Sequence, residues 1–147
     1  MNQDNQRIID KLKHPDFAEF CRQNNIDLAM LFGSRATGTA RENSDFDVAI
    51  LLDRRIYPAD TLARGGCKRT ILLNLVDYLA SSRIDLVVLN DASSFLVYQI
   101  IQTGQVLYEK NPAEFARLAS LAIRQYSDGY LFREAEKKYL GGQRCNG

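Results

Sequence analysis

One stretch of this chain decides its fold: LFGSRATGTARENSDFDVAIL, residues 31–51. It contains the end of one short apolar run, a polar segment rich in glycine, threonine and arginine, and the start of a second apolar run. Short apolar runs bounded by turn residues are typical of buried strands. We therefore expect strands over residues 26–32 and 46–52, separated by a break at Gly33-Ser34 and a polar segment that reaches Ser44.

The break at Gly33-Ser34 has the properties of a phosphate-binding turn. A helix that starts directly after a strand points its backbone N–H groups at a bound anion. Glycine lets the backbone come close to the anion, and the Ser34 hydroxyl adds a donor. Arg35 is a candidate for neutralising phosphate charge, although most such arginines are solvated surface residues. The pattern is not a P-loop, because GxxxxGK[ST] is absent, and Ser34 acting only as a helix cap stays open as an alternative.

Asp45 and Asp47 begin the second predicted strand. Side chains alternate across a strand, so these two carboxylates point the same way. Two adjacent carboxylates repel each other unless a cation lies between them, and hard oxygen ligands suit Mg²⁺. A solvated turn is the ordinary explanation for one such pair. The fixed offset from Gly33-Ser34, together with a third aspartate further along, favours a metal site.

The third aspartate, Asp85, lies at the start of an apolar run over residues 84–89 that predicts another strand. If this strand neighbours the one that begins at Asp45, three carboxylates form a cluster able to hold two metal ions about 3.5–4 Å apart. Asp85 would then bind a metal or accept the proton of an acceptor hydroxyl. Taken alone, an aspartate at the start of a strand can simply face water.

The rest of the chain alternates helices and strands. Helices are expected over 4–24 with a break at Pro15, over 58–81, over 95–101 and over 112–140, and a short strand over 106–108. Gly65-Gly66 are expected to start or interrupt the second of these helices. The alternation predicts an α+β or α/β fold, a short mixed sheet with helices packed on it. Residues 1–140 are expected to form one domain, and residues 141–147 a disordered tail.

Composition narrows the function further. With 19 Lys and Arg against 18 Asp and Glu, the net charge is +1, so bulk attraction to nucleic acid or membrane is not expected, although a local basic groove stays open. No apolar run is long enough to span a membrane and no leader is recognisable near Met1, so a cytoplasmic location is expected. Three scattered cysteines give neither a disulfide framework nor zinc-ligand spacing, and Cys21 is predicted to face the core.

The last predicted helix carries an apolar stripe. Its members share helical spacing: Phe115, Leu118, Ala122, Tyr126 and Tyr130. Core packing is the ordinary explanation for such a stripe. The aromatic residues Tyr130, Phe132 and Tyr139 exceed what the edge of a small core needs, so the helix over 112–140 is also a candidate surface for a partner or for a homodimer.

Gly33-Ser34, ten residues, then Asp45-x-Asp47 and the distal Asp85 resemble the GSx10DxD signature of the nucleotidyltransferase superfamily. The short length, with Arg35 and Gly38 after the serine, resembles the minimal nucleotidyltransferase branch. That branch includes the MntA-like antitoxins of HEPN/MNT toxin–antitoxin pairs. The resemblance implies a polymerase beta-like nucleotidyltransferase fold.

The resemblance also implies roles for the motif residues. Gly33 and Ser34 would bind the β- and γ-phosphates of ATP, Asp45 and Asp47 would ligate two Mg²⁺ ions, and Asp85 would be the third ligand and base. The implied reaction moves AMP from ATP to a tyrosine of a HEPN ribonuclease toxin and silences it. Two alternatives stay open: transfer to a small molecule such as an aminoglycoside, and a non-catalytic antitoxin that blocks the toxin sterically. The sequence sets neither the base preference nor the number of nucleotides transferred.

Overall fold

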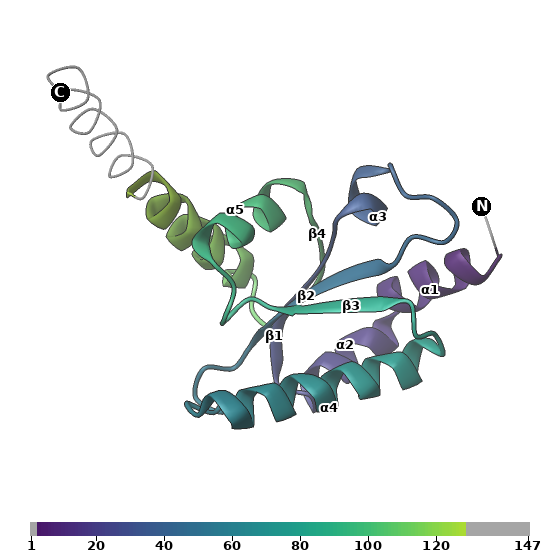
Figure 1. Ribbon diagram of the computed structural model, residues 1–147, viewed down its shortest axis with the longest axis horizontal. Coiled ribbons are helices and arrows are strands. Elements are labelled where there is room, and N and C mark those ends of the chain that lie inside the picture. The colour runs from purple at the N-terminus through teal and green to yellow at the C-terminus, as the bar shows by residue number, and fades with distance from the viewer. Residues whose placement is uncertain (1–2, 129–147) are drawn as a thin grey trace, which may run out of the picture.

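A four-stranded sheet with helices on both faces forms the body of the protein in the computed structural model, which describes residues 3–128 (Figure 1). The helices are α1 (Gln3–Lys13), α2 (Pro15–Gln23), α3 (Ser34–Thr37), α4 (Thr61–Leu79) and α5 (Ser94–Thr103). The strands are β1 (Ile26–Phe32), β2 (Phe46–Leu52), β3 (Ile84–Val88) and β4 (Gln105–Glu109). A further helix occupies residues 114–128.

The sheet is mixed, with strand order β3-β2-β1-β4. β1 pairs antiparallel with both β2 and β4. β2 and β3 run parallel because α4 returns the chain to the starting edge of the sheet, as parallel neighbours require. The predicted short mixed sheet is therefore confirmed, and β1 and β2 have the predicted bounds.

The two faces of the sheet carry separate cores. On one face, Phe46, Val48 and Ile50 of β2 pack with buried residues of α1, α2 and α4. On the other face, Ala49 and Leu51 pack with α5 and the helix over residues 114–128, and Figure 1 shows these two sets of helices on opposite sides. Alternation along β2 assigns Asp47 to the α5 face.

The break predicted near Pro15 is confirmed. α1 ends at Lys13, and α2 begins at Pro15, a residue suited to the first turn of a helix. His14 caps α2: its Nδ1 accepts a hydrogen bond from the backbone N–H of Asp16 at 3.1 Å. The single histidine of the chain thus has a local structural role.

The prediction that Gly65-Gly66 start or interrupt a helix is wrong. α4 begins four residues earlier, at Thr61, where the Asp60 carboxylate accepts a hydrogen bond from the N–H of Ala63 at 3.0 Å. The helix then continues through both glycines. Its buried residues Ile71, Leu75 and Leu79 supply packing that outweighs the poor helix propensity of two glycines.

One side of the helix over residues 114–128 packs against the core, and most of its other residues are exposed. Leu118 and Ala122 are buried in the α5-side cluster, and the Tyr126 ring stacks on that of Tyr98 with centroids 4.2 Å apart. The other aromatic candidates, Tyr130, Phe132 and Tyr139, and the predicted tail over 141–147 lie outside the described residues. Within residues 3–128, no helix is long and apolar enough to cross a membrane.

Candidate active site

Parallel pairing of β2 and β3 brings the predicted carboxylates together. Asp47 and Asp85 are direct partners in the register, and Asp45 lies two residues before Asp47, just outside β2. The pKa of Asp47 is raised, first by burial and then by the negative charges of Asp85 and Asp45. The three carboxylates therefore lie close enough to interact, as the sequence predicted.

Gly33 borders this cluster from the neighbouring strand. β1 ends at Phe32, which is the register partner of Asp47, and Gly33 follows with a φ of 71°. A Cβ atom at position 33 would collide with Asp47 Oδ2 and lie 3.1 Å from Asp47 Cγ. Only glycine allows both this backbone conformation and this close approach, so the predicted phosphate turn lies directly against the predicted metal site.

Ser34 begins the one-turn helix α3, which Gly33 and Gly38 flank at its two ends. The first N–H groups of a helix have no intrahelical partner, so they remain available to an anion. Here the carbonyl of Gly33 accepts from the N–H groups of Ala36 and Thr37 at 3.1 and 3.2 Å, which orients the turn. Ser34 is half-buried.

Arg35, the candidate for neutralising phosphate charge, contacts the loop that carries Asp45. Its Nη2 donates to the carbonyls of Ser44 and Glu42 at 2.7 and 3.2 Å, and its guanidinium lies over the Phe46 ring, 4.4 Å from the centroid. Burial, with a smaller contribution from the charge of Arg83, lowers its pKa. The structure thus brings Arg35 to the loop that carries Asp45, and its guanidinium is engaged there.

The donor set fits Mg²⁺ as a shared site. Among the described residues, no group of three or more Asp, Glu, His or Cys side chains is placed so that it could hold a metal ion. Mg²⁺ seldom uses an all-protein cage: it keeps several waters and binds through one or two carboxylates plus substrate phosphates. The raised pKa of Asp47 also reports an excess of negative charge that a cation would neutralise. These residues therefore fit a metal that arrives with a nucleotide.

One buried polar residue near the site was missed by the sequence analysis. Asn5 is 1% exposed, and its Nδ2 donates to the carbonyl of Glu42 at 3.0 Å. A signal was available, because Asn5, Ile8 and Leu12 are the buried residues of α1 and share its inner face. A polar residue within an apolar stripe points to a specific buried partner.

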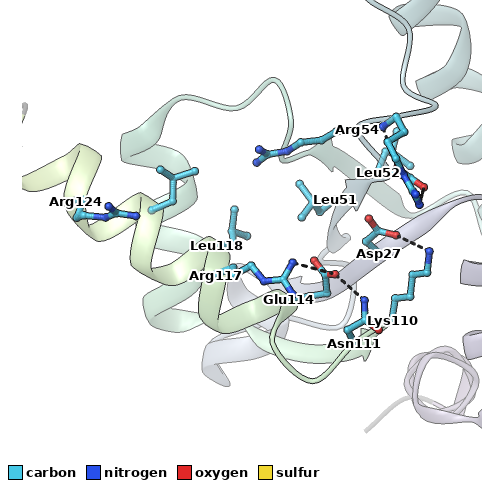
Figure 2. A pocket seen from close by; sticks show the side chains of 13 residues that line it. Asp27, Leu51, Leu52, Arg54, Lys110, Asn111, Glu114, Arg117, Leu118 and Arg124 are labelled. Carbon is cyan, nitrogen blue, oxygen red and sulfur yellow. Dashed lines mark hydrogen bonds and ion pairs between the residues drawn. The ribbon is translucent and has the colours of Figure 1, made fainter.

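A second feature, a cleft of about 450 Å³, lies at the other end of the sheet. It is lined by the start of β1, the end of β2, the residues after β4 and the helix over 114–128 (Figure 2). Three of its basic residues are paired with acids: Arg55 with Asp53 at 3.0 Å, Lys110 with Asp27 at 3.9 Å, and Arg117 with Glu114 at 4.0 Å. The cleft therefore has mixed charge, and its lining includes none of Asp45, Asp47 and Asp85.

Comparison with known proteins gives two similar curated sequences. The protein adenylyltransferase MntA of Aphanizomenon flos-aquae (strain 2012/KM1/D3) is 34% identical over 97 residues, 61% of each chain. The protein adenylyltransferase MntA of Shewanella oneidensis (strain MR-1) is 36% identical over 83 residues, 56% of this chain and 54% of that protein. The matched segments span less than two thirds of either relative.

Solved structures and a family model agree with these matches. A toxin–antitoxin crystal structure with AMP-PNP superposes with a TM-score of 0.64 at 27% identity, over 95% of this chain and 98% of that one. The MntA–HepT toxin–antitoxin structure gives 0.61 at 25% identity, over 88% and 97%. The model of the family "Polymerase beta, Nucleotidyltransferase" matches residues 16–113. That segment is more than half of the chain and contains Gly33, Ser34 and all three aspartates, so the chain belongs to the polymerase beta nucleotidyltransferase family.

Proposed function

We propose that this chain is a Mg²⁺-dependent protein adenylyltransferase that moves AMP from ATP to a tyrosine hydroxyl of a HEPN-type ribonuclease toxin, and so acts as its antitoxin. The observation that carries the proposal is the register of Asp47 with Asp85 beside Gly33, because it brings the candidate metal ligands against the candidate phosphate turn. The two curated relatives are named protein adenylyltransferases. The structures at 27% and 25% identity are toxin–antitoxin complexes, one of them with an ATP analogue.

The residues have separate roles in this reaction. Gly33 and Ser34 would hold the β- and γ-phosphates at the start of α3, where backbone N–H groups face an anion. Asp45, Asp47 and Asp85 would hold two Mg²⁺ ions. When bound, Mg²⁺ neutralises triphosphate charge and lowers the pKa of a coordinated hydroxyl. Arg35 would act through the loop that carries Asp45, since its guanidinium is engaged there.

The chemical step is a substitution at the α-phosphorus. The tyrosine oxygen forms a bond to this phosphorus, the bond from phosphorus to the β-phosphate bridging oxygen breaks, and pyrophosphate leaves. Asp85, which is exposed, would accept the hydroxyl proton. Phosphoryl-type transfer depends mainly on positioning and on charge stabilisation. Carboxylates that hold Mg²⁺ beside a phosphate turn would supply both.

Intact-mass spectrometry tests the proposal directly. The protein, ATP and Mg²⁺ are incubated with a HEPN-type toxin encoded beside it, and an Asp45→Asn/Asp47→Asn variant is run in parallel. AMP-sized mass increments on a toxin tyrosine, absent with the variant, support the proposal. A toxin that is neutralised without any increment would instead support a steric antitoxin. Pyrophosphate release that depends on a small-molecule acceptor would support the other alternative.

A further inference from the structure

The loop between α3 and β2 is held at a single carbonyl group by three separate parts of the chain. The carbonyl oxygen of Glu42 accepts hydrogen bonds from Asn5 Nδ2 at 3.0 Å, Arg83 Nη1 at 2.8 Å and Arg35 Nη2 at 3.2 Å. Asn5 lies on α1, Arg35 on α3, and Arg83 directly before β3. We call these three residues the Glu42 clasp.

The clasp fixes the chain on both sides of Asp45. Before it, the carbonyl of Ser44 accepts from Arg35 Nη2 at 2.7 Å. After it, the N–H of Phe46 donates to the carbonyl of Arg83 at 2.9 Å. Asp45 itself lies outside β2, so the position of its carboxylate depends on these contacts more than on the sheet.

Asn5 is suited to this task because it is buried and neutral. Both ends of its amide are used: Nδ2 donates to Glu42, and Oδ1 accepts from Arg83 Nη2. A charged residue at position 5 would change the electrostatic potential at the three carboxylates or form an ion pair with Arg83. α1 does not need Asn5 for attachment, because Ile8 and Leu12 on the same face are 0% and 1% exposed.

We propose that Asn5 is a positioning residue, which, through the Glu42 clasp, holds Asp45 against the repulsion of Asp47 and Asp85 in the geometry that binds metal. α1 lies ahead of the segment matched by the family model, residues 16–113. The proposal therefore extends the site to a helix outside that segment. The inference rests on the proposed function for its catalytic meaning. Hydrogen exchange of the loop and the affinity for metal can be measured whether or not the proposed function holds.

The experiment compares Asn5→Ala with Ile8→Val, a matched substitution on the same buried face of α1. Hydrogen exchange of peptides spanning residues 38–45 is measured by mass spectrometry, and Mn²⁺ binding in the presence of ATP by titration. Asn5→Ala is expected to speed exchange in this loop by about tenfold, the effect of losing one buried hydrogen bond. It is also expected to weaken Mn²⁺ binding by a similar factor, while Ile8→Val leaves both as in the wild type.

Transfer assays add the catalytic test. Asn5→Ala is expected to lower kcat/KM by about 10- to 100-fold, with part of the loss restored by raised Mg²⁺. Arg83→Lys keeps the charge but loses the guanidinium that reaches both Glu42 and Asn5. It should also speed loop exchange, weaken Mn²⁺ binding and lower kcat/KM, and it replaces Asn5→Ala if that variant does not fold.

The inference would be overturned if Asn5→Ala and Arg83→Lys had the loop exchange and Mn²⁺ affinity of the wild type. It would also be overturned if Ile8→Val sped loop exchange and weakened Mn²⁺ binding as much as Asn5→Ala. If the wild type transfers no AMP to any acceptor, the proposed function fails. Exchange and Mn²⁺ titration still decide whether the clasp positions Asp45.

Discussion

Asp47 and Asp85 lie opposite each other on the parallel strands β2 and β3. Burial and the charges of Asp85 and Asp45 together raise the pKa of Asp47. A carboxyl whose pKa is raised by folding destabilises the folded protein once it ionises. This cost is absent below the pKa of the unfolded chain, grows as pH rises, and is complete above the folded pKa. At neutral pH the ionised cluster therefore lowers the free energy of unfolding, a destabilisation that the proposed metal site requires.

Asp47→Asn should accordingly raise Tm at pH 7 while abolishing transfer activity. Each kcal/mol gained shifts Tm by roughly 2–4 °C for a chain of this size, and the gain should shrink toward zero near pH 3, where carboxyls are protonated in both states. Thermal unfolding followed by circular dichroism at both pH values measures this. Asp77→Asn, on the exposed face of α4, is the control. A variant no more stable than wild type at pH 7 would contradict the argument.

Metal and nucleotide should reverse this destabilisation in the wild type. A ligand that binds only the folded state adds about 2.7 kcal/mol at a concentration 100 times its Kd. Mg²⁺ with a non-hydrolysable ATP analogue should therefore raise Tm by several degrees, and removing Mg²⁺ with EDTA should cancel most of the shift. The Asp45→Asn/Asp47→Asn variant should respond little. An equal shift in that variant would mean that the metal binds elsewhere.

Local patterns were enough to predict much of the site. β1 and β2 are short apolar runs with polar ends, and the alternation of side chains alone put Asp45 and Asp47 on one side. The prediction for Asp85 depended on the assumption that its strand neighbours β2. The parallel register of β2 and β3 confirms that assumption. These features depend on spacing within single segments, which a sequence displays directly.

Long-range contacts were not predictable in the same way. Arg35 has the sequence context of a phosphate ligand, yet carbonyls at Glu42 and Ser44 engage it once the loop folds back. Asn5 has no motif around it, and its partner is 37 residues away. Gly65-Gly66 were expected to disturb α4 because propensity is local, whereas the packing that holds this helix comes from other elements.

Cys21 should be unreactive in the folded protein. It is 0% exposed, and burial raises the pKa of its thiol to about 12. Since the thiolate is the nucleophile, iodoacetamide at pH 8 should leave Cys21 unmodified until a denaturant is added. The half-buried Cys67 is the internal comparison, and peptide mapping by mass spectrometry measures both. Alkylation of Cys21 at the rate of Cys67 would show that the core around α2 opens easily.

Two glycines with positive φ values differ in ψ and in the space around them: ψ is −155° at Gly33 and 14° at Gly38. Gly33 and Gly38 have φ values of 71° and 80°, but only at Gly33 would a Cβ meet the carboxylate of Asp47; at Gly38 nothing lies within 4 Å. Gly38→Ala incurs the cost of a left-handed backbone, about 1–2 kcal/mol, and Gly33→Ala incurs that of a conformation almost restricted to glycine, about 1–3 kcal/mol.

Gly33→Ala must in addition displace the Asp47 side chain, so it should remove adenylyl transfer and metal-dependent stabilisation together. Gly38→Ala should show the stability cost in urea unfolding while keeping transfer within a few-fold of wild type. Similar activity losses in the two variants would indicate that the turn at Gly33 matters through its backbone angles. Loss confined to Gly33→Ala would assign the requirement for glycine to position 33, where both the backbone conformation and the contact with Asp47 exclude a Cβ.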